Sequence, residues 1–295
     1  MHKLIDLGYM DTLETQTVYS AVARQMSREK SRDTTIIVCI PRDPAICIGY
    51  HQHHTEVDTK LPVIRREIGG GVVYLEKNQV FYQVIAPSKG MRNPIPVYKR
   101  FLQPAVDTLH ELGIEGKYVP DADIWVRGKK ISGNAGGRIA DADVIGGNLL
   151  VDFDREVMSS SMNINDDAKR LFAGGMKKYL TTIKQETGDV NVNEVKRILI
   201  ENFNNNLDIE YRNLTGEELK LMKELNRKYK TERWIQMKDY MLSKSRKGIK
   251  VAEGTYIHEI KYGDENTVVM VQDGVITCSA TEGLIGKPYN QNKIK

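Results

Sequence analysis

Residues 64–87 read IRREIGGGVVYLEKNQVFYQVIAP, and the rest of the chain is interpreted from this stretch. Two adjacent arginines, Arg65 and Arg66, close an apolar run, and a glycine triplet at 69–71 follows three residues later. Glycine triplets free φ and carry no Cβ, so bare backbone N–H groups can close on an anion. Arginine adds a planar fork that suits a phosphate or a carboxylate. The same letters also fit a flexible loop with solvated arginines.

Two β-rich segments follow the glycines, residues 72–75 and 80–86, joined across residues 77–78. Their branched and aromatic residues predict strands on either side of a short turn. The glycine loop is therefore expected to lie between strands, with backbone positions fixed on both sides.

Composition restricts the possible classes of protein. The chain has 295 residues, 40% hydrophobic and 28% charged, with a net charge of +4. No basic run with interleaved aromatic residues appears, so nucleic acid is not an expected partner. No apolar run reaches membrane length and the start of the chain lacks a signal-peptide core, so we expect a soluble, cytoplasmic protein without a membrane partner.

Neither cysteines nor histidines indicate a metal site. Cys39, Cys47 and Cys278 sit in apolar, strand-like runs without CxxC spacing, which disfavours a disulfide framework or a zinc site. The cluster His51, His53 and His54 invites a metal interpretation, but no further ligand stands at a recognisable spacing. We expect a polar loop that enters a short helix there, and no bound metal ion of the protein's own.

Helical and extended patterns alternate along the chain. Helices are predicted over residues 12–26, over 95–112, after the cap at Asn191 and after the capping box at Thr215; strands over 34–40, 45–49, 118–126 and 208–212. Residues 166–183 are basic and, because of two glycines, loop-prone. Short β segments from Lys247 onward predict a small β-rich appendage, which gives domains 1–245 and 246–295.

A second informative stretch, residues 129–154, reads KKISGNAGGRIADADVIGGNLLVDFD. Strand-like pieces at 130–132 and 148–153 enclose small residues. A lysine among small residues on a strand can deliver one compact positive charge into a narrow cleft. If Lys130 faces Arg66 and the glycine loop, the site can neutralise a carboxylate and an α-phosphate together, as activation of an acid with ATP demands. A solvated lysine in a Lys-Lys turn is the alternative.

Together the two stretches resemble the lipoate-protein ligase A family. The resemblance is carried by Arg65-Arg66-x-x-Gly69-Gly70-Gly71-x-Val73, Lys130-Ile131-Ser132-Gly133-x-Ala135, Ile48-Gly49-Tyr50-x-Gln52, Glu56-Val57-Asp58, residues 148–154 and Glu232-Arg233-Trp234. It covers most of the first 240 residues. It implies an α/β (α+β) fold, a biotinyl/lipoyl-ligase-like domain with a mixed, mostly antiparallel sheet flanked by helices.

The resemblance also implies a reaction. The family condenses lipoate with ATP to lipoyl-adenylate and pyrophosphate, and then passes the lipoyl group to a lysine of a lipoyl domain or a glycine-cleavage H-like protein. Magnesium is expected with ATP. The C-terminal appendage is expected to serve the adenylation half-reaction. Lipoate and octanoate both remain open as the acid.

Site residues carry over by position. Arg66 and the backbone of Gly71, Val72, Val73 and Tyr74 would hold the nucleotide phosphates, and a Cβ at Gly70 would fill space meant for phosphate. Lys130, in a motif with Ser132 and Gly133, would contact the lipoyl carbonyl and the adenylate phosphate. Asp123 matches an aspartate expected near the adenylate.

The chain departs from the family at several polar positions. Leu75 stands where a histidine is usual, Ala122 where an asparagine precedes the aspartate, and Gly146-Gly147 where His-Gly is common. Arg138 lies only approximately where the family has an arginine. These losses leave two further interpretations open. One is an octanoyl or lipoyl transferase, which needs an accessible cysteine thiolate; the other is a non-catalytic lipoyl-carrier binding protein. The glycine pattern is not that of a biotin ligase.

Overall fold

The computed structural model describes residues 1–88, 95–120, 122–237, 248–252, 254–262, 265–279, 281 and 283–289. The chain divides into two compact units. The large unit is formed by residues 1–51, 61–153 and 181–237; the small unit by 52–60, 154–180 and the C-terminal part from 238. The domain boundary expected at residue 245 lies outside the described residues.

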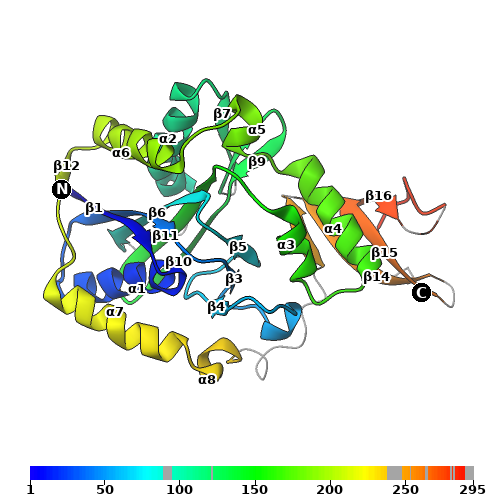
Figure 1. Cartoon of the computed structure of the whole chain (residues 1–295), viewed down its shortest axis with the longest axis horizontal. Helices are drawn as coiled ribbons and strands as arrows, with labels where there is room; N and C mark the ends of the chain where they lie inside the picture. Colours follow the sequence, from blue (N-terminus) through cyan, green and yellow to red (C-terminus); the bar gives the residue numbers. More distant parts are fainter. Residues whose placement is uncertain are drawn as a thin grey trace. The chain divides into compact units, whose positions relative to one another are not determined.

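A six-stranded sheet forms the centre of the large unit (Figure 1). Its order is β10 (Asn134–Ile139), β11 (Ala142–Leu150), β6 (Gln79–Pro87), β2 (Thr34–Pro41), β1 (His2–Met10) and β12 (Ile209–Tyr211). The pairs from β10 to β2 are antiparallel, and β1 pairs parallel with both β2 and β12. The predicted mixed, mostly antiparallel sheet is confirmed.

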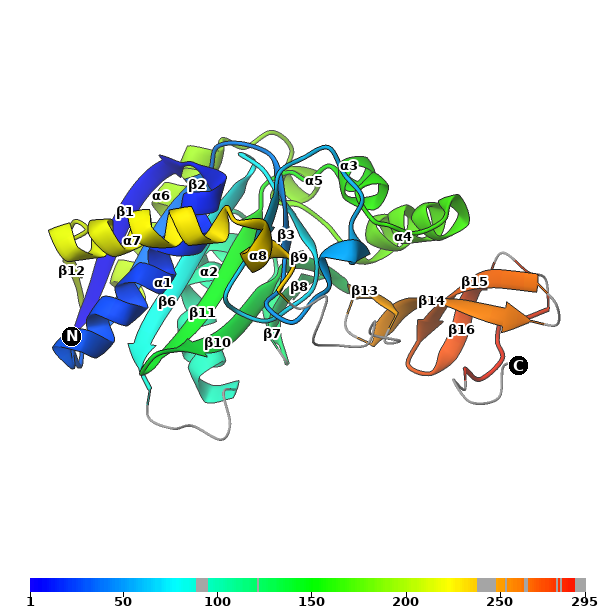
Figure 2. The same cartoon turned by 90° about the horizontal axis from the view of Figure 1, so that it is seen from below.

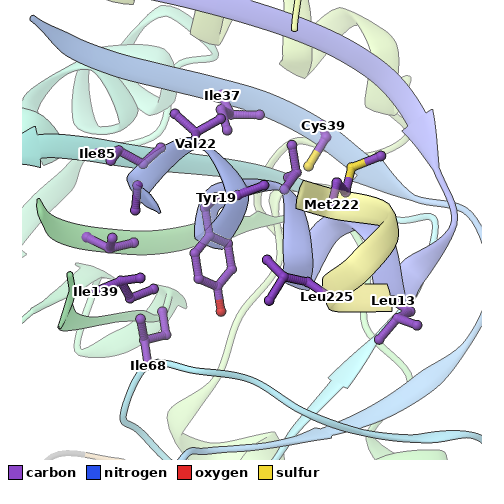
Figure 3. Packing of buried hydrophobic residues seen from close by; sticks show 14 of the residues in the cluster. Leu13, Tyr19, Val22, Ile37, Cys39, Ile68, Ile85, Ile139, Met222 and Leu225 are labelled. Carbon is purple, nitrogen blue, oxygen red and sulfur yellow. The ribbon is translucent and has the colours of Figure 1, made fainter. Parts of the chain in front are cut away.

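Helices cover both faces of this sheet (Figure 2). On one face, α1 (Thr12–Glu29) and α7 (Gly216–Tyr229) enclose an apolar cluster whose members include Tyr19, Ile37 and Leu225 (Figure 3). On the other face, α2 (Ile95–Glu111) and α6 (Val192–Asn206) pack over the opposite side chains of the strands. The alternation of strand side chains thus feeds two cores.

The predicted helix starts are confirmed by their caps. Asp11 accepts from the Leu13 N–H at the start of α1, and Thr215 and Glu218 form a capping box at the start of α7. Two short helices, α5 (Ile183–Thr187) and α8 (Glu232–Ile235), complete the helices described in the large unit.

Two three-stranded sheets carry the sequence motifs. One has the order β4 (Val63–Arg65), β3 (Ala45–Ile48) and β5 (Val73–Leu75); the other is an antiparallel meander of β7 (Gly116–Val119), β8 (Asp123–Val126) and β9 (Lys129–Ser132). The strands predicted after the glycines, β5 and β6, are both present but belong to different sheets. The short connection between them therefore crosses from one sheet to the next.

The small unit contains a short 3-10 helix (His54–Glu56), α3 (Arg155–Ser160), α4 (Asp166–Tyr179) and an antiparallel sheet of β13 (Ile249–Ala252), β14 (Thr255–Tyr262), β15 (Glu265–Gln272) and β16 (Val275–Ser279). The expectation of a loop-prone segment at 166–183 is wrong, because α4 continues through both glycines. A Cβ at Gly175 would lie 2.9 Å from Met270 Cε and 3.0 Å from Val251 Cγ1. Close packing on the sheet therefore explains this glycine.

The strand expected at 148–153 also begins earlier in the structure. β11 runs from Ala142 to Leu150, and its two central glycines, Gly146 and Gly147, pair with β6 and β10.

No helix in the described part of the chain is long and apolar enough to cross a membrane.

Candidate functional site

Arg66 shapes the glycine loop from inside. Its side chain is only 5% exposed, and its guanidinium donates to the carbonyls of Gly69 (2.8 and 3.0 Å), Gly71 (2.7 Å) and Cys47 (3.2 Å). In a trans peptide the C=O and the following N–H point in opposite directions. Because the Gly69 and Gly71 carbonyls turn toward Arg66, the N–H groups of Gly70 and Val72 point away from it. The loop thus offers donors to an anion on that side.

The glycines of this loop have different surroundings. Gly70 has φ +94°, and a Cβ added there would lie 2.7 Å from Arg66 Nη2 and 3.2 Å from Ala135 Cβ. A Cβ on Gly49 would lie 2.0 Å from the Gly70 carbonyl oxygen. A Cβ on Gly71 would meet nothing within 4 Å. The open space expected beside Gly70 is therefore found beside Gly71.

The strand after the loop presents Val72, Val73 and Tyr74 in sequence. Val73 is 39% exposed, and its backbone pairs with Cys47 of β3. Tyr74 is buried and its ring packs against Phe153, with ring centroids 6.1 Å apart. This anchoring holds the backbone of the segment in place next to the loop.

Arg65 and Glu67, which flank Arg66, anchor the loop to helices. Arg65 is fully buried and donates to the Ile235 carbonyl in α8 at 2.6 and 2.8 Å. Glu67 accepts a two-point contact from Arg24 and a hydrogen bond from Tyr229 Oη at 2.7 Å. Burial alone would raise the pKa of Glu67, but the bonds from Arg24 and Tyr229 outweigh it and the pKa lies below its usual value.

Lys130 lies in β9 and forms an ion pair with Asp123 of β8. Lys130 Nζ is 2.9 Å from Asp123 Oδ1, and the two side chains are 23% and 11% exposed. The ideal Cβ position of Gly133 is 3.1 Å from Lys130 Nζ, so the ammonium lies against a bare backbone. The alternative of a solvated lysine in a turn is not what the structure shows.

The lysine and the glycine loop meet along one short segment. Gly69 N–H donates to the Gly136 carbonyl at 3.4 Å, and the Gly70 Cβ position is in contact with Ala135. Lys130 packs on Gly133, which precedes Ala135 by two residues. An extended chain rises about 3.3 Å per residue, so the backbone at Gly133 and that at Ala135 are roughly 7 Å apart. Both motifs therefore contact the same short segment, residues 133–136.

A hydrogen-bond chain that the sequence did not indicate links the two motifs. The Tyr74 carbonyl accepts from Gln79 Nε2 at 2.9 Å, Gln79 Oε1 accepts from Asn148 Nδ2 at 3.1 Å, and Asn148 Oδ1 accepts from the Gly133 N–H at 3.3 Å. Gln79 is fully buried. Only the pairing of β6 with β11 brings these side chains together, so no sequence spacing could have found them.

Ser132 is also fully buried and belongs to a second group of polar side chains. Its hydroxyl lies 3.1 Å from Tyr82 Oη and 3.3 Å from Asn134 Nδ2. Sequence reasoning placed Ser132 among the binding residues but missed Tyr82 and Asn134.

The positions that depart from the family pattern have structural roles. Leu75 is 2% exposed and belongs to the apolar core, and the Ala122 carbonyl accepts from Asn134 Nδ2 at 2.6 Å. A Cβ at Gly146 would lie 3.1 Å from Ile68 Cδ1. Arg138 is exposed and pairs with Asp143 at 3.1 Å, at the far end of β10 from the lysine.

The cysteines give little support to the transferase alternative, which needs an accessible thiolate. Cys39 and Cys47 are fully buried; burial raises the pKa of Cys39 to about 12 and also raises that of Cys47, where Arg66 offsets only part of the effect. Cys278 is half-buried in the small unit.

Among the described residues no three His, Cys, Asp or Glu side chains come together to hold a metal ion.

Residues 11–204 match the family model of the lipoyl protein ligase A/B catalytic domain. The chain is 27% identical over 202 residues to lipoate–protein ligase 1 of Staphylococcus aureus, covering 65% of this chain and 61% of the relative. It is 32% identical over 151 residues to the lipoate–protein ligase of Streptococcus pyogenes, covering 48% and 42%. The match thus spans about half the length of these relatives.

A solved structure shows the same fold. It is that of an archaeal lipoylation system from Thermoplasma acidophilum, a bipartite lipoate protein ligase described with its E2 lipoyl domain. The TM-score is 0.70 at 24% identity, and the superposition covers 83% of this chain and 98% of that one.

Proposed function

The chain belongs to the lipoyl protein ligase A/B catalytic-domain family, and we propose on this basis that it joins lipoate to a lysine of a carrier protein with consumption of ATP. In the first half-reaction the lipoate carboxylate attacks the α-phosphorus, lipoyl-adenylate forms and pyrophosphate leaves. In the second, the acceptor amine attacks the lipoyl carbonyl, and an amide and AMP result.

The glycine loop is proposed to receive the nucleotide phosphates. Support comes from Arg66, which turns the Gly69 and Gly71 carbonyls inward and so directs the N–H groups of Gly70 and Val72 outward. The open space beside Gly71 gives a phosphate room to approach. In this proposal Arg66 contributes by holding the loop. The donors are the N–H group of Val72, within the expected segment from Gly71 to Tyr74, and that of Gly70 beside it.

The observation that carries the proposal is the Lys130 ammonium, held by Asp123 against Gly133 and next to the strand that the glycine loop contacts. Negative charge collects on the oxygens that join the carboxylate carbon to phosphorus as the mixed anhydride forms. A fixed ammonium stabilises that charge without needing to reorganise. Asp123 keeps Lys130 aimed when the site is empty.

ATP would bring Mg²⁺ with it. Magnesium is commonly held by substrate phosphates and one or two carboxylates, and it would neutralise the charge of the leaving pyrophosphate. Asp123 is the carboxylate described at this site, which suits an ion held mainly by the nucleotide.

The proposed acceptor is a lipoyl-carrier protein, either a lipoyl domain or a glycine-cleavage H-like protein. The archaeal ligase of the same fold is described together with an E2 lipoyl domain, which supports this class of partner. The acid is lipoate or octanoate, and the test below separates them.

The direct test is ATP–pyrophosphate exchange, measured with lipoate or octanoate and without a carrier protein. Exchange that depends on the acid is expected for a ligase. A transferase or a carrier-binding protein gives no exchange. If neither lipoate nor octanoate supports exchange, the proposed reaction is refuted.

Lys130→Ala should lower the exchange rate by about 10²- to 10³-fold, as expected for loss of one charged group in the transition state. Lys129→Ala is the matched control, since adjacent residues of a strand project to opposite faces. If both variants exchange like the parent protein, the assignment of Lys130 fails.

A further inference from the structure

Polar side chains from the central sheet and from β9 connect to the Lys130–Asp123 pair; Tyr82 and Ser132 are buried, and Asn134 is partly buried. Asn134 Nδ2 donates to the Ala122 carbonyl at 2.6 Å, and Asn134 Oδ1 accepts from Tyr82 Oη at 2.6 Å. Because a carbonyl oxygen can only accept, the amide of Asn134 has one orientation. The Ala122 carbonyl belongs to the peptide that leads into Asp123, so this bond fixes the point from which the carboxylate side chain departs.

Tyr82 supplies the rigid end of this arrangement. It lies in β6, is fully buried, and its ring packs edge-on against Phe203 at 6.2 Å. Burial raises the pKa of the Tyr82 hydroxyl well above its usual range, so it stays protonated and donates to Asn134. The remaining contacts with Ser132 close a ring of three polar groups whose members polarise one another.

Gly147 is the residue that makes this arrangement possible. In the register of the sheet it stands opposite both Tyr82 and Asn134. A Cβ at Gly147 would lie 1.8 Å from Asn134 Oδ1 and 2.6 Å from Tyr82 Cζ. No other residue type leaves room there for the hydrogen bond between them.

We infer that Tyr82 and Asn134 are positioning residues, which hold the Ala122 peptide and thereby keep Asp123 aimed at Lys130. The chain of contacts runs from the sheet through the Tyr82 hydroxyl, the Asn134 amide and the Ala122 carbonyl to the carboxylate. Without the hydroxyl the amide can rotate, the Ala122 peptide is released and the ion pair loosens. The catalytic consequence of this inference rests on the proposed adenylation; the geometric consequence does not.

The test compares Tyr82→Phe, Asn134→Ala and the double variant with the parent protein. In ATP–pyrophosphate exchange each single variant should lose about 10- to 100-fold in kcat with little change in KM, the range found when a functional group loses the residue that orients it. The double variant should lose no more than the worse single variant, because Tyr82 acts on the pair only through Asn134. Independent, multiplying losses would overturn the inference.

A second readout does not depend on activity. In competitive labelling with acetic anhydride, followed by peptide mass spectrometry, Lys130 should react several-fold faster in Tyr82→Phe than in the parent protein. Lys129 of the same peptide serves as the internal reference. Thr108→Val, which removes a buried hydroxyl bonded to the Pro104 carbonyl within α2, controls for general loosening and should leave the Lys130 rate unchanged.

The two readouts separate the possible failures. If the parent protein shows no exchange, the proposed function fails and the labelling rates still decide the positioning role. If Tyr82→Phe keeps both the parental kcat and the parental Lys130 labelling rate, the inference is overturned. Should Tyr82→Phe not fold, Asn134→Ala removes the same hydrogen bond at a side chain that is only partly buried, and its kcat and Lys130 labelling rate decide instead.

Discussion

The glycine loop gives the sharpest prediction, because the same substitution at two adjacent glycines should lower stability at one and the affinity for Mg-ATP at the other. In Gly70→Ala an alanine would have to adopt the backbone angle φ +94°, and its methyl group would lie 2.7 Å from Arg66 Nη2. A strained backbone of this kind costs about 1–3 kcal/mol, and weakening one hydrogen bond from the charged Arg66 costs about 1.5–3 kcal/mol. Partial relaxation of the loop reduces the total, and we expect Gly70→Ala to lower the free energy of unfolding by about 2–4 kcal/mol.

In Gly71→Ala the methyl group would enter open space, so the free energy of unfolding should change by less than about 1 kcal/mol. The same methyl group would stand where phosphate is proposed to approach, so the affinity for Mg-ATP should fall by at least about tenfold. Urea denaturation followed by tryptophan fluorescence gives the stability, and calorimetry gives the affinity.

The comparison has a clear point of failure. Equal stabilities of Gly70→Ala and the parent protein would show that Arg66 does not hold the loop as described. A Gly71→Ala protein that binds Mg-ATP like the parent would show that the nucleotide lies elsewhere.

Further expectations concern the surroundings of the site. The pKa of Glu67 lies below its usual value of 4.5. The stabilisation from its bonds with Arg24 is therefore complete above about pH 4.5 and is lost as the pH falls through the lowered pKa. Glu67→Gln should flatten this acidic part of the pH–stability curve, measured by urea titration. Gln79→Met interrupts the link to Asn148 and should slow ATP–pyrophosphate exchange about tenfold, whereas an unchanged rate would make that link purely structural. Gly175→Leu should separate α4 from the sheet of the small unit; if that unit serves adenylation, exchange will suffer more than transfer from preformed lipoyl-adenylate, and equal losses would argue against this role.

Local patterns in the sequence were sufficient for several elements. The capping residues Asp11 and Thr215 placed the starts of α1 and α7, since a cap and the helix it begins are close in the chain. The β-branched run at 34–40 predicted a buried strand for the same reason. The two motifs in their order also indicated the family to which residues 11–204 belong.

Other features followed only from contacts between distant residues. The glycines of α4 suggested a loop, but Gly175 is required by the close approach of Met270, some ninety-five positions later. The glycines of β11 were likewise expected to precede a strand, whereas Gly147 lies within it and makes room for Tyr82 and Asn134. A glycine's local preference is the same in all these places, and only the neighbours differ.

The sequence by itself determined which groups are available for the proposed reaction of an acid with a nucleotide: a glycine loop with its arginine, and a lysine among small residues. Tertiary structure alone decided how these groups are arranged. Arg66 turned inward to the loop carbonyls, Lys130 became paired with Asp123, and Tyr82 became bonded to Asn134, which in turn bonds the Ala122 carbonyl. The physical reason is that hydrogen-bond direction and burial depend on which strands lie side by side, and strand pairing joins residues that no local spacing relates.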